Sequence, residues 1–124
     1  MVVLHKQHYQ DNKLLKMNWF NLTSFDQLDE IIVQSSQKPQ LIFKHSTRCS
    51  VSFLAKSRLE KHGPQDSIDA FYLDLLQYRD LSNEIAERFH VQHQSPQVLL
   101  IIDGECVYEE THNAIYMDDI LEQV

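Results

Sequence analysis

The sequence predicts an α/β domain built on a mixed sheet of four to five strands that is flanked by helices. Short apolar runs typical of strands alternate with segments whose apolar residues recur at helical spacing, which indicates a parallel core. Near the C-terminus, Asp103-Gly104 separates two strand-like runs, so a hairpin is expected to add antiparallel strands. The 124 residues, 43% of them hydrophobic, suffice for one domain with its own core.

The first strand is expected over residues 19–22. Ser24 and Gln27 then match a capping-box pattern, which predicts a helix that runs to about Gln34. Its inward stripe is expected to comprise Phe25, Leu28, Ile31 and Ile32. The second strand is expected over residues 41–44, where a continuous apolar core indicates burial on both faces.

The second helix is expected over residues 50–61, because Gly63 and Pro64 follow it and neither continues a helix well. Its inward side chains are predicted to be Val51, Leu54, Ala55 and Leu59. A third strand is expected over residues 70–76. A third helix should follow, capped by Asp80 or Ser82 and burying Leu81, Ile85 and Phe89.

The aliphatic residues 98–102 predict the fourth strand, and residues 106–108 return from the Asp-Gly turn as an antiparallel edge strand. A short helix over residues 116–124 ends the chain. The resulting order, β-α-β-α-β-α-β-β-α, is that of a thioredoxin-like fold. The domain is expected to cover residues 19–124, after an N-terminal extension over residues 1–18.

Composition excludes several classes of function. The formal charge of −7 disfavours binding to a phosphate backbone, so no nucleic-acid partner is expected. No window approaches the roughly 20 apolar residues of a membrane helix, and the N-terminus is too polar for a signal peptide. The protein is therefore expected to be cytoplasmic, with both of its cysteines reduced.

Cys49 is the candidate nucleophile, because it is expected where the second strand ends and the second helix begins. The positive end of a helix stabilises a thiolate, and the N–H groups of Val51 and Ser52 can point at the sulfur. Lys44, His45 and Arg48 are candidates for added positive potential. The alternative is an inert, buried cysteine, which its polar neighbours argue against. Ser52 stands where a Cys-x-x-Cys pair would have its second thiol.

Ser95-Pro96 precedes the fourth strand, where thioredoxin-like folds hold a cis-proline that faces the redox cysteine. Pro96 is then a shape element, and the backbone of Ser95 is free to pair with an extended substrate. An ordinary trans proline at the start of a strand is the alternative. Cys106, in the edge strand, is expected to be a structural or bystander thiol rather than a resolving one.

No native metal is expected. His90-x-x-His93 and His5-x-x-His8 have a two-residue spacing without adjoining cysteine or carboxylate ligands, which matches no strong zinc signature. The glycine-rich cysteine loop of the single-thiol glutaredoxins that bind an iron–sulfur cluster is also missing. With only two glycines, the chain has no phosphate-binding glycine motif.

The run from Phe43 to Ser52, FKHSTRCSVS, with Ser95-Pro96-Gln97-Val98 and Asp103-Gly104 downstream, resembles the monothiol bacilliredoxins of the bacillithiol system in bacteria. The likeness extends from about Trp19 to the C-terminus. A second cysteine, Cys106, departs from the single redox thiol expected in this family.

The resemblance implies a thioredoxin-like fold and thiol–disulfide exchange on proteins that carry a mixed disulfide with bacillithiol. Cys49 is then the attacking thiolate, and substrate contacts are expected from Thr47, Arg48, Ser50, Ser52, Ser95 and Pro96. The implied partners are S-thiolated proteins and bacillithiol, the latter a co-substrate rather than a bound cofactor. Free bacillithiol or a reductase is expected to regenerate the thiol.

Two other functions stay open at this point. A thioredoxin-fold binding module could use Cys49 as an oxidation sensor without turnover. A monothiol glutaredoxin would use glutathione, whose two carboxylates favour a cationic site. Lys44 and Arg48 suit either thiol, so the sequence does not decide between them. The protein substrates, the reductase and the oligomeric state are not predicted.

Overall fold

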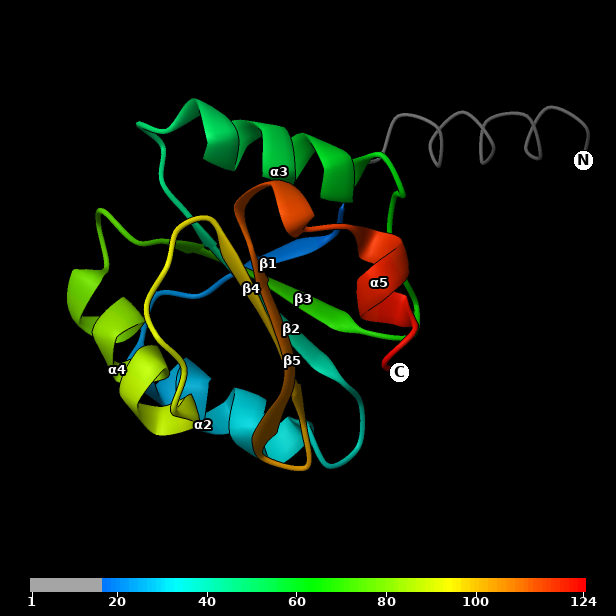
Figure 1. Cartoon of the computed structure of the whole chain (residues 1–124). Helices are drawn as coiled ribbons and strands as arrows, with labels where there is room; N and C mark the ends of the chain where they lie inside the picture. The colour runs from blue at the N-terminus through cyan, green and yellow to red at the C-terminus, as the bar shows by residue number, and fades with distance from the viewer. Residues whose placement is uncertain (1–16) are drawn as a thin grey trace, which may run out of the picture.

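The computed structural model describes residues 17–124, which form a five-stranded sheet with helices on both faces (Figure 1). The elements in chain order are β1 (Trp19–Asn21), α2 (Phe25–Gln34), β2 (Gln40–His45), α3 (Ser50–Glu60), β3 (Asp69–Asp74), α4 (Arg79–Phe89), β4 (Gln97–Ile102), β5 (Glu105–Thr111), the 3-10 helix η1 (His112–Ala114) and α5 (Met117–Leu121). This confirms the predicted fold class and order of elements. Most of the predicted extension, residues 1–18, lies outside the described residues.

The sheet is mixed, with the strand order β1-β3-β2-β4-β5. β3 pairs in parallel with both β1 and β2, whereas β4 is antiparallel to β2 and to β5. Strand β2 is therefore central, and Lys44 lies opposite Gln97 at its C-terminal end. No helix of the described segment, residues 17–124, is long and apolar enough to cross a membrane.

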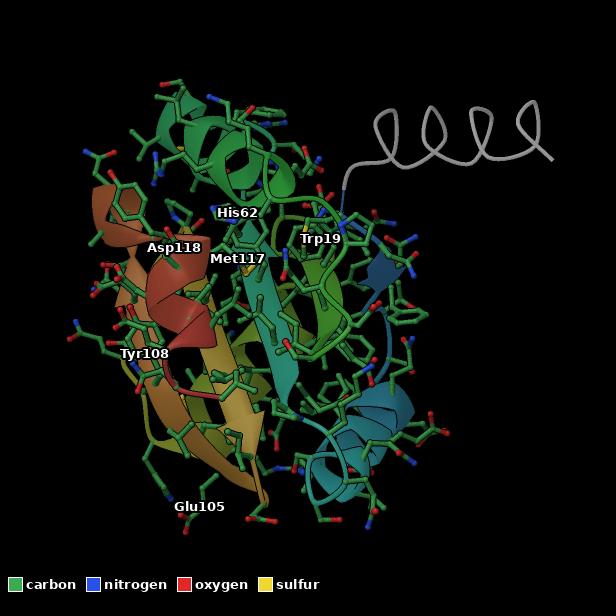
Figure 2. The ribbon with its side chains drawn as sticks, turned by 90° about the vertical axis from the view of Figure 1, so that its right-hand side faces the viewer. Trp19, His62, Glu105, Tyr108, Met117 and Asp118 are labelled. Atoms are coloured by element: carbon green, nitrogen blue, oxygen red, sulfur yellow. The ribbon has the colours of Figure 1, made fainter. Side chains whose placement is uncertain are left out.

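Two apolar cores lie on opposite faces of the sheet. α2 and α4 cover one face, where Leu28 and Ile85 pack on Ile42 and Leu99. α3 and α5 cover the other, where Leu59 packs with Phe43. Figure 2 shows α3 and α5 on this second face, with Met117 at the start of α5, where it is part of this core. Successive β2 side chains thus enter alternate layers, as expected for a strand buried on both sides.

Two details of the helices differ from the predictions. The inward residues of α3 are Ser52, Ala55 and Leu59, while the predicted Leu54 is 58% exposed. The helix can turn a serine inward because the Ser52 hydroxyl finds partners there. In α2, likewise, Phe25 is exposed.

The cap predicted for α4 was also wrong. The helix begins at Arg79 after Tyr78, and neither Asp80 nor Ser82 is its N-cap. Asp80 instead lies in the first turn, where a carboxylate favours the positive helix end. Ser82 faces the core and is fully buried.

A buried serine ties the β4–β5 hairpin to the end of α2. Asp103 and Gly104 both have positive φ, as a two-residue turn of the predicted kind requires. The backbone N–H of Gly104 donates to Ser35 Oγ at 2.8 Å, and the N–H of Asp103 donates to the Ser35 carbonyl at 3.0 Å. Ser35 Oγ donates in turn to the carbonyl of Ile32 at 2.6 Å. One side chain therefore links two elements that are far apart in the sequence.

We expect Ser35→Ala to lower the free energy of unfolding by about 1–3 kcal/mol, because it leaves the partly buried Gly104 N–H without its acceptor. Urea denaturation measures this change. Ser36→Ala is the matched control, since the Ser36 side chain is exposed and bonds only to its close neighbours Val33 and Gln37. We expect the control to change stability by less than about 0.5 kcal/mol. Equal losses in the two variants would contradict the assignment.

Candidate active site

Cys49 and the Ser95-Pro96 segment lie at the same end of the sheet. β2 ends at His45, and the chain reaches the start of α3 through the short loop that carries Cys49. β4 begins at Gln97, whose ladder partner on β2 is Lys44. The residue before β4, Pro96, therefore lies level with the start of the cysteine loop. The Ser95-Pro96 peptide bond is cis, as predicted.

Cys49 is the N-cap of α3, as the sequence predicts, and holds this position through its backbone. Its N–H donates to the carbonyl of Ser46, and its carbonyl accepts from the N–H of Phe53, both at 3.2 Å. The thiol is free and half-buried. The first turn of α3 contains no acidic residue, so no carboxylate offsets the positive helix end beside the sulfur.

The expected hydrogen bonds from helix N–H groups to the sulfur are not formed. Cys49 makes no side-chain capping bond to the first turn of α3, so Val51 and Ser52 do not donate to it. The favourable field at the thiol comes from the helix as a whole rather than from a directed hydrogen bond. The sulfur is consequently available to a reaction partner without first breaking a protein hydrogen bond.

A buried hydrogen-bond network holds the cysteine loop. Ser52 Oγ accepts from the backbone N–H of Ser46 at 3.0 Å and lies 2.6 Å from Nδ1 of His45. All of these contacts cross from the end of β2 to the first turn of α3. The predicted role of Ser52 as a substrate contact is therefore corrected, because its side chain is fully buried and already bonded. Its position in the structure is that of a residue which positions the loop.

His45 is a neutral, buried member of this network. Its ring is packed against Phe43, Phe53 and Tyr72, with ring centroids 4.8 to 5.7 Å apart. Burial lowers the pKa of His45, and the nearby Lys56 lowers it further. The second ring nitrogen, Nε2, is buried and has no hydrogen-bond partner among residues 17–124. His45 thus adds no positive charge beside Cys49 at neutral pH.

Lys44 points into the opposite layer and also adds no charge beside Cys49. Its Nζ donates to the carbonyl of Ser82 at 3.0 Å and lies 3.2 Å from Nδ1 of His93. Burial lowers the pKa of Lys44 from 10.5 to about 8. Burial also lowers the pKa of His93, as do the charges of Lys44 and Arg79. The lysine connects β2, α4 and the chain that leads to Ser95.

Three of the remaining predicted contacts flank Cys49 in the chain. Thr47, Arg48 and Ser50 are all exposed on the loop and at the start of the helix. Of the three cations proposed to act on the thiol, only Arg48 is therefore exposed beside it. The backbone N–H and carbonyl of Ser95 have no hydrogen-bond partner within the described part of the chain, and Ser95 Oγ is buried without one. Substrate contact by these residues stays a prediction.

Cys106 is far from this end of the sheet. It pairs with Ile101 beside the hairpin turn, whereas Thr111, at the other end of β5, pairs with Gln97. Figure 2 shows Glu105, the residue before it, at the end of the molecule away from α3. Burial raises the pKa of the Cys106 thiol, and Sγ lies 3.3 Å from the Tyr108 carbonyl. This geometry agrees with a structural thiol that does not resolve a disulfide on Cys49.

The sequence did not reveal that Ser46 and His93 take part in the hydrogen bonds around the site. Nor did it reveal that Lys44 and His45 anchor the site on opposite faces of the sheet. Alternation along β2 is the signal that could have separated Lys44 from His45, since neighbouring strand residues face opposite layers.

In the described residues, no three His, Cys, Asp or Glu side chains gather as a metal site would require. His5 and His8 lie outside the described residues.

The similarities to known proteins agree with this geometry. The family described as "Monothiol bacilliredoxin BrxC" matches residues 20–120. A solved structure of a candidate oxidoreductase with a thioredoxin fold is 31% identical and superposes with a TM-score of 0.69, covering 83% of this chain and 90% of that one.

Two thioredoxins are similar in fold at much lower identity. Thioredoxin from Malassezia sympodialis is 13% identical, with a TM-score of 0.66 over 83% of this chain and 84% of its own. Thioredoxin f from spinach chloroplast is 15% identical, with a TM-score of 0.64 over 87% and 89%. These identities show a common fold only.

We expect Ser52→Ala to lower the free energy of unfolding by about 1–3 kcal/mol, because it leaves the Ser46 N–H and the His45 ring without their buried partner. Chemical denaturation measures the loss. Ser50→Ala, at an exposed position two residues earlier, is the control and should stay within about 0.5 kcal/mol of wild type. A Ser52→Ala protein as stable as the control would rule out the proposed anchoring role.

Lys44 should make stability depend on pH. Between about pH 8 and 10.5 the unfolded chain retains a proton that the folded chain has lost, so unfolding becomes harder as pH rises. We expect wild type to gain up to about 3 kcal/mol relative to Lys44→Met across this window. Denaturation curves at several pH values test this, with the exposed Lys61→Met as control. Parallel pH curves for wild type and Lys44→Met would contradict it.

Proposed function

This chain belongs to the monothiol bacilliredoxin family. Because its family and fold support a thiol redox function, we propose that it removes bacillithiol from protein mixed disulfides. Cys49 is the nucleophile. The observation that carries the proposal is a free, half-buried thiol at the N-terminus of α3 whose sulfur has no capping hydrogen bond to the helix.

The first step is an attack by the Cys49 thiolate on the bacillithiol sulfur of the mixed disulfide. A bond forms between Cys49 Sγ and that sulfur, the old disulfide bond breaks, and the substrate protein leaves as a thiolate. One disulfide is exchanged for another, so no external oxidant or reductant takes part. The positive end of α3 favours the attacking thiolate, which must be deprotonated to react.

A second thiol must then regenerate the protein. No second cysteine is in reach, because Cys106 lies at the far end of the β4–β5 hairpin and Ser52 carries a hydroxyl in place of the resolving thiol. The mixed disulfide on Cys49 therefore persists until an external thiolate attacks its bacillithiol sulfur. Free bacillithiol would give bacillithiol disulfide and release Cys49 as a thiolate.

The substrate end of the site suits an extended peptide. The backbone N–H and carbonyl of Ser95, which have no partner in the part of the chain that the structure describes, offer one donor and one acceptor beside cis-Pro96, in the manner of strand addition. Thr47, Arg48 and Ser50 are exposed on the other side of Cys49 and are the proposed contacts to the thiolated protein. We place this reaction in the cytoplasm, where substrate thiols are kept reduced.

We expect Cys49→Ser to abolish thiol exchange, because serine is not a nucleophile towards a disulfide. Cys106→Ser should keep activity close to wild type, since the thiol that it removes is half-buried and far from the site. The measurement is release of the free thiol from a bacillithiolated model protein in the presence of excess bacillithiol. Comparable loss in the two variants would show that Cys106 takes part in the reaction.

Mass spectrometry of the reduced protein after exposure to bacillithiol disulfide, with glutathione disulfide in parallel, tests the choice of thiol. The proposal expects one adduct on Cys49, formed faster with bacillithiol and removed by free bacillithiol. Faster reaction with glutathione would indicate a glutaredoxin-like function. An adduct that forms but supports no turnover with excess thiol would indicate a sensor.

A further inference from the structure

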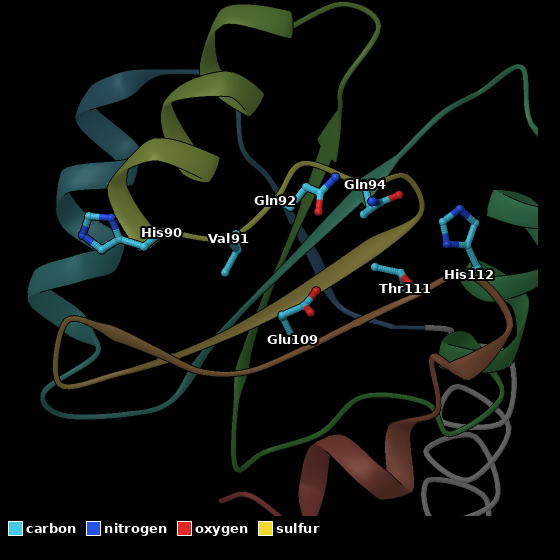
Figure 3. Close-up of a pocket in the computed structure, with 7 residues that line it drawn as sticks. All are labelled: His90, Val91, Gln92, Gln94, Glu109, Thr111 and His112. Carbon is cyan, nitrogen blue, oxygen red and sulfur yellow. The ribbon is translucent and has the colours of Figure 1, made fainter.

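A polar groove with a volume of about 480 Å³ opens beside the Ser95-Pro96 segment, between the chain that follows α4 and the end of β5 (Figure 3). It is lined by His90, Val91, Gln92, Gln94, Glu109, Thr111 and His112. Its size falls within the range of about 300–1,000 Å³ that is typical of small-molecule sites. Nothing in the thiol-exchange step described above uses these side chains.

The groove adjoins the active-site end of the sheet. Thr111 pairs with Gln97, which is also the ladder partner of Lys44 at the end of β2. The backbone N–H of His112 donates to the Pro96 carbonyl at 3.0 Å. Gln94 directly precedes Ser95. The groove therefore opens beside Pro96, at the same end of the sheet as the loop that carries Cys49.

The lining offers neutral hydrogen-bonding groups that are not used within the protein. The side-chain amides of Gln92 and Gln94 and the hydroxyl of Thr111 have no hydrogen-bond partner in residues 17–124. Figure 3 shows the two glutamines on one side of the groove and Thr111 and Glu109 on the other. Glu109 uses Oε2 to accept from Gln97, and its Oε1 has no partner within the described residues. No lysine or arginine of residues 17–124 lines the groove.

We propose that this groove binds the sugar of the bacillithiol moiety and so selects that thiol over others; the inference rests on the function proposed above. Two amides, a hydroxyl and one carboxylate oxygen are donors and acceptors that match the hydroxyl groups around a sugar ring. Glutathione is a peptide with two carboxylates and no hydroxyl groups, so it brings no sugar hydroxyl to the acceptors of this groove, and one of its carboxylates would face Glu109 with no lysine or arginine among the described lining residues to offset the charge. An unpaired polar group weakens binding, which produces selectivity.

The test compares two substrates that differ only in the sugar and its malate. One peptide carries a mixed disulfide with bacillithiol, and the same peptide carries one with cysteine, which has the reacting sulfur but no sugar. In the double variant Gln94→Ala, Thr111→Val, the half-saturating concentration of the bacillithiol substrate should rise about tenfold, as expected for two lost hydrogen bonds. The maximal rate and all constants for the cysteine substrate should stay unchanged.

Gln34→Ala is the matched control. Gln34 is an exposed glutamine at the end of α2, on no element of the groove, and its loss should change neither substrate. A rise of equal size for both substrates would show that the double variant disturbs the site in general, and would overturn the inference. An unchanged half-saturating concentration for the bacillithiol substrate would overturn it as well.

A second measurement uses the Cys49→Ser protein, which cannot react. Reduced bacillithiol is titrated while the side-chain amide signals of the glutamines are followed by NMR. Shifts at Gln92 and Gln94, with none at Gln34, support the groove; no shift at Gln92 or Gln94 overturns it.

If wild type does not process the bacillithiol substrate at all, the proposed function itself fails. If wild type processes the bacillithiol substrate and the groove variant processes it equally well, the proposed function stands and only this inference fails.

Discussion

Strand β2 is buried on both of its faces, so each side chain that it carries must find a partner in one of two helical layers. Apolar residues meet this demand by packing, as Ile42 and Phe43 do in opposite cores. The last two residues, Lys44 and His45, are ionisable and meet it by hydrogen bonding instead. The position of the active-site loop depends on how these two residues are accommodated.

Each of the two residues ties the sheet to a different part of the site. His45 bonds to Ser52, which also accepts from the Ser46 N–H, so the cysteine loop is held to the first turn of α3. Lys44 bonds to the Ser82 carbonyl and to His93, two residues before Ser95. Burial lowers the pKa of both groups, because their charged forms are poorly solvated there. These two buried side chains thus hold the Cys49 loop in place, while the positive end of α3 provides the field that favours the thiolate.

The site is open around a single sulfur. Cys49 holds its place through backbone bonds alone, and no second thiol lies near it. Such a thiol forms a mixed disulfide that only an external thiol can resolve, so selectivity must come from what binds beside the sulfur. The Ser95 backbone, which has no hydrogen-bond partner among residues 17–124, and the polar groove between Gln94 and Thr111 are the surfaces that we propose for two different parts of a substrate, a peptide and a sugar.

The sequence by itself determined the order of the elements, the Asp103-Gly104 turn, the capping position of Cys49 and the place of Ser95-Pro96. These features rest on local periodicity, turn chemistry and capping, which neighbouring residues decide. Only the tertiary structure decided that α3 turns Ser52 inward and Leu54 outward, and that Lys44 faces α4. Alternation along β2 places Lys44 and His45 in opposite layers, but which layer each one enters depends on hydrogen-bond partners 7 to 49 positions away that packing brings together.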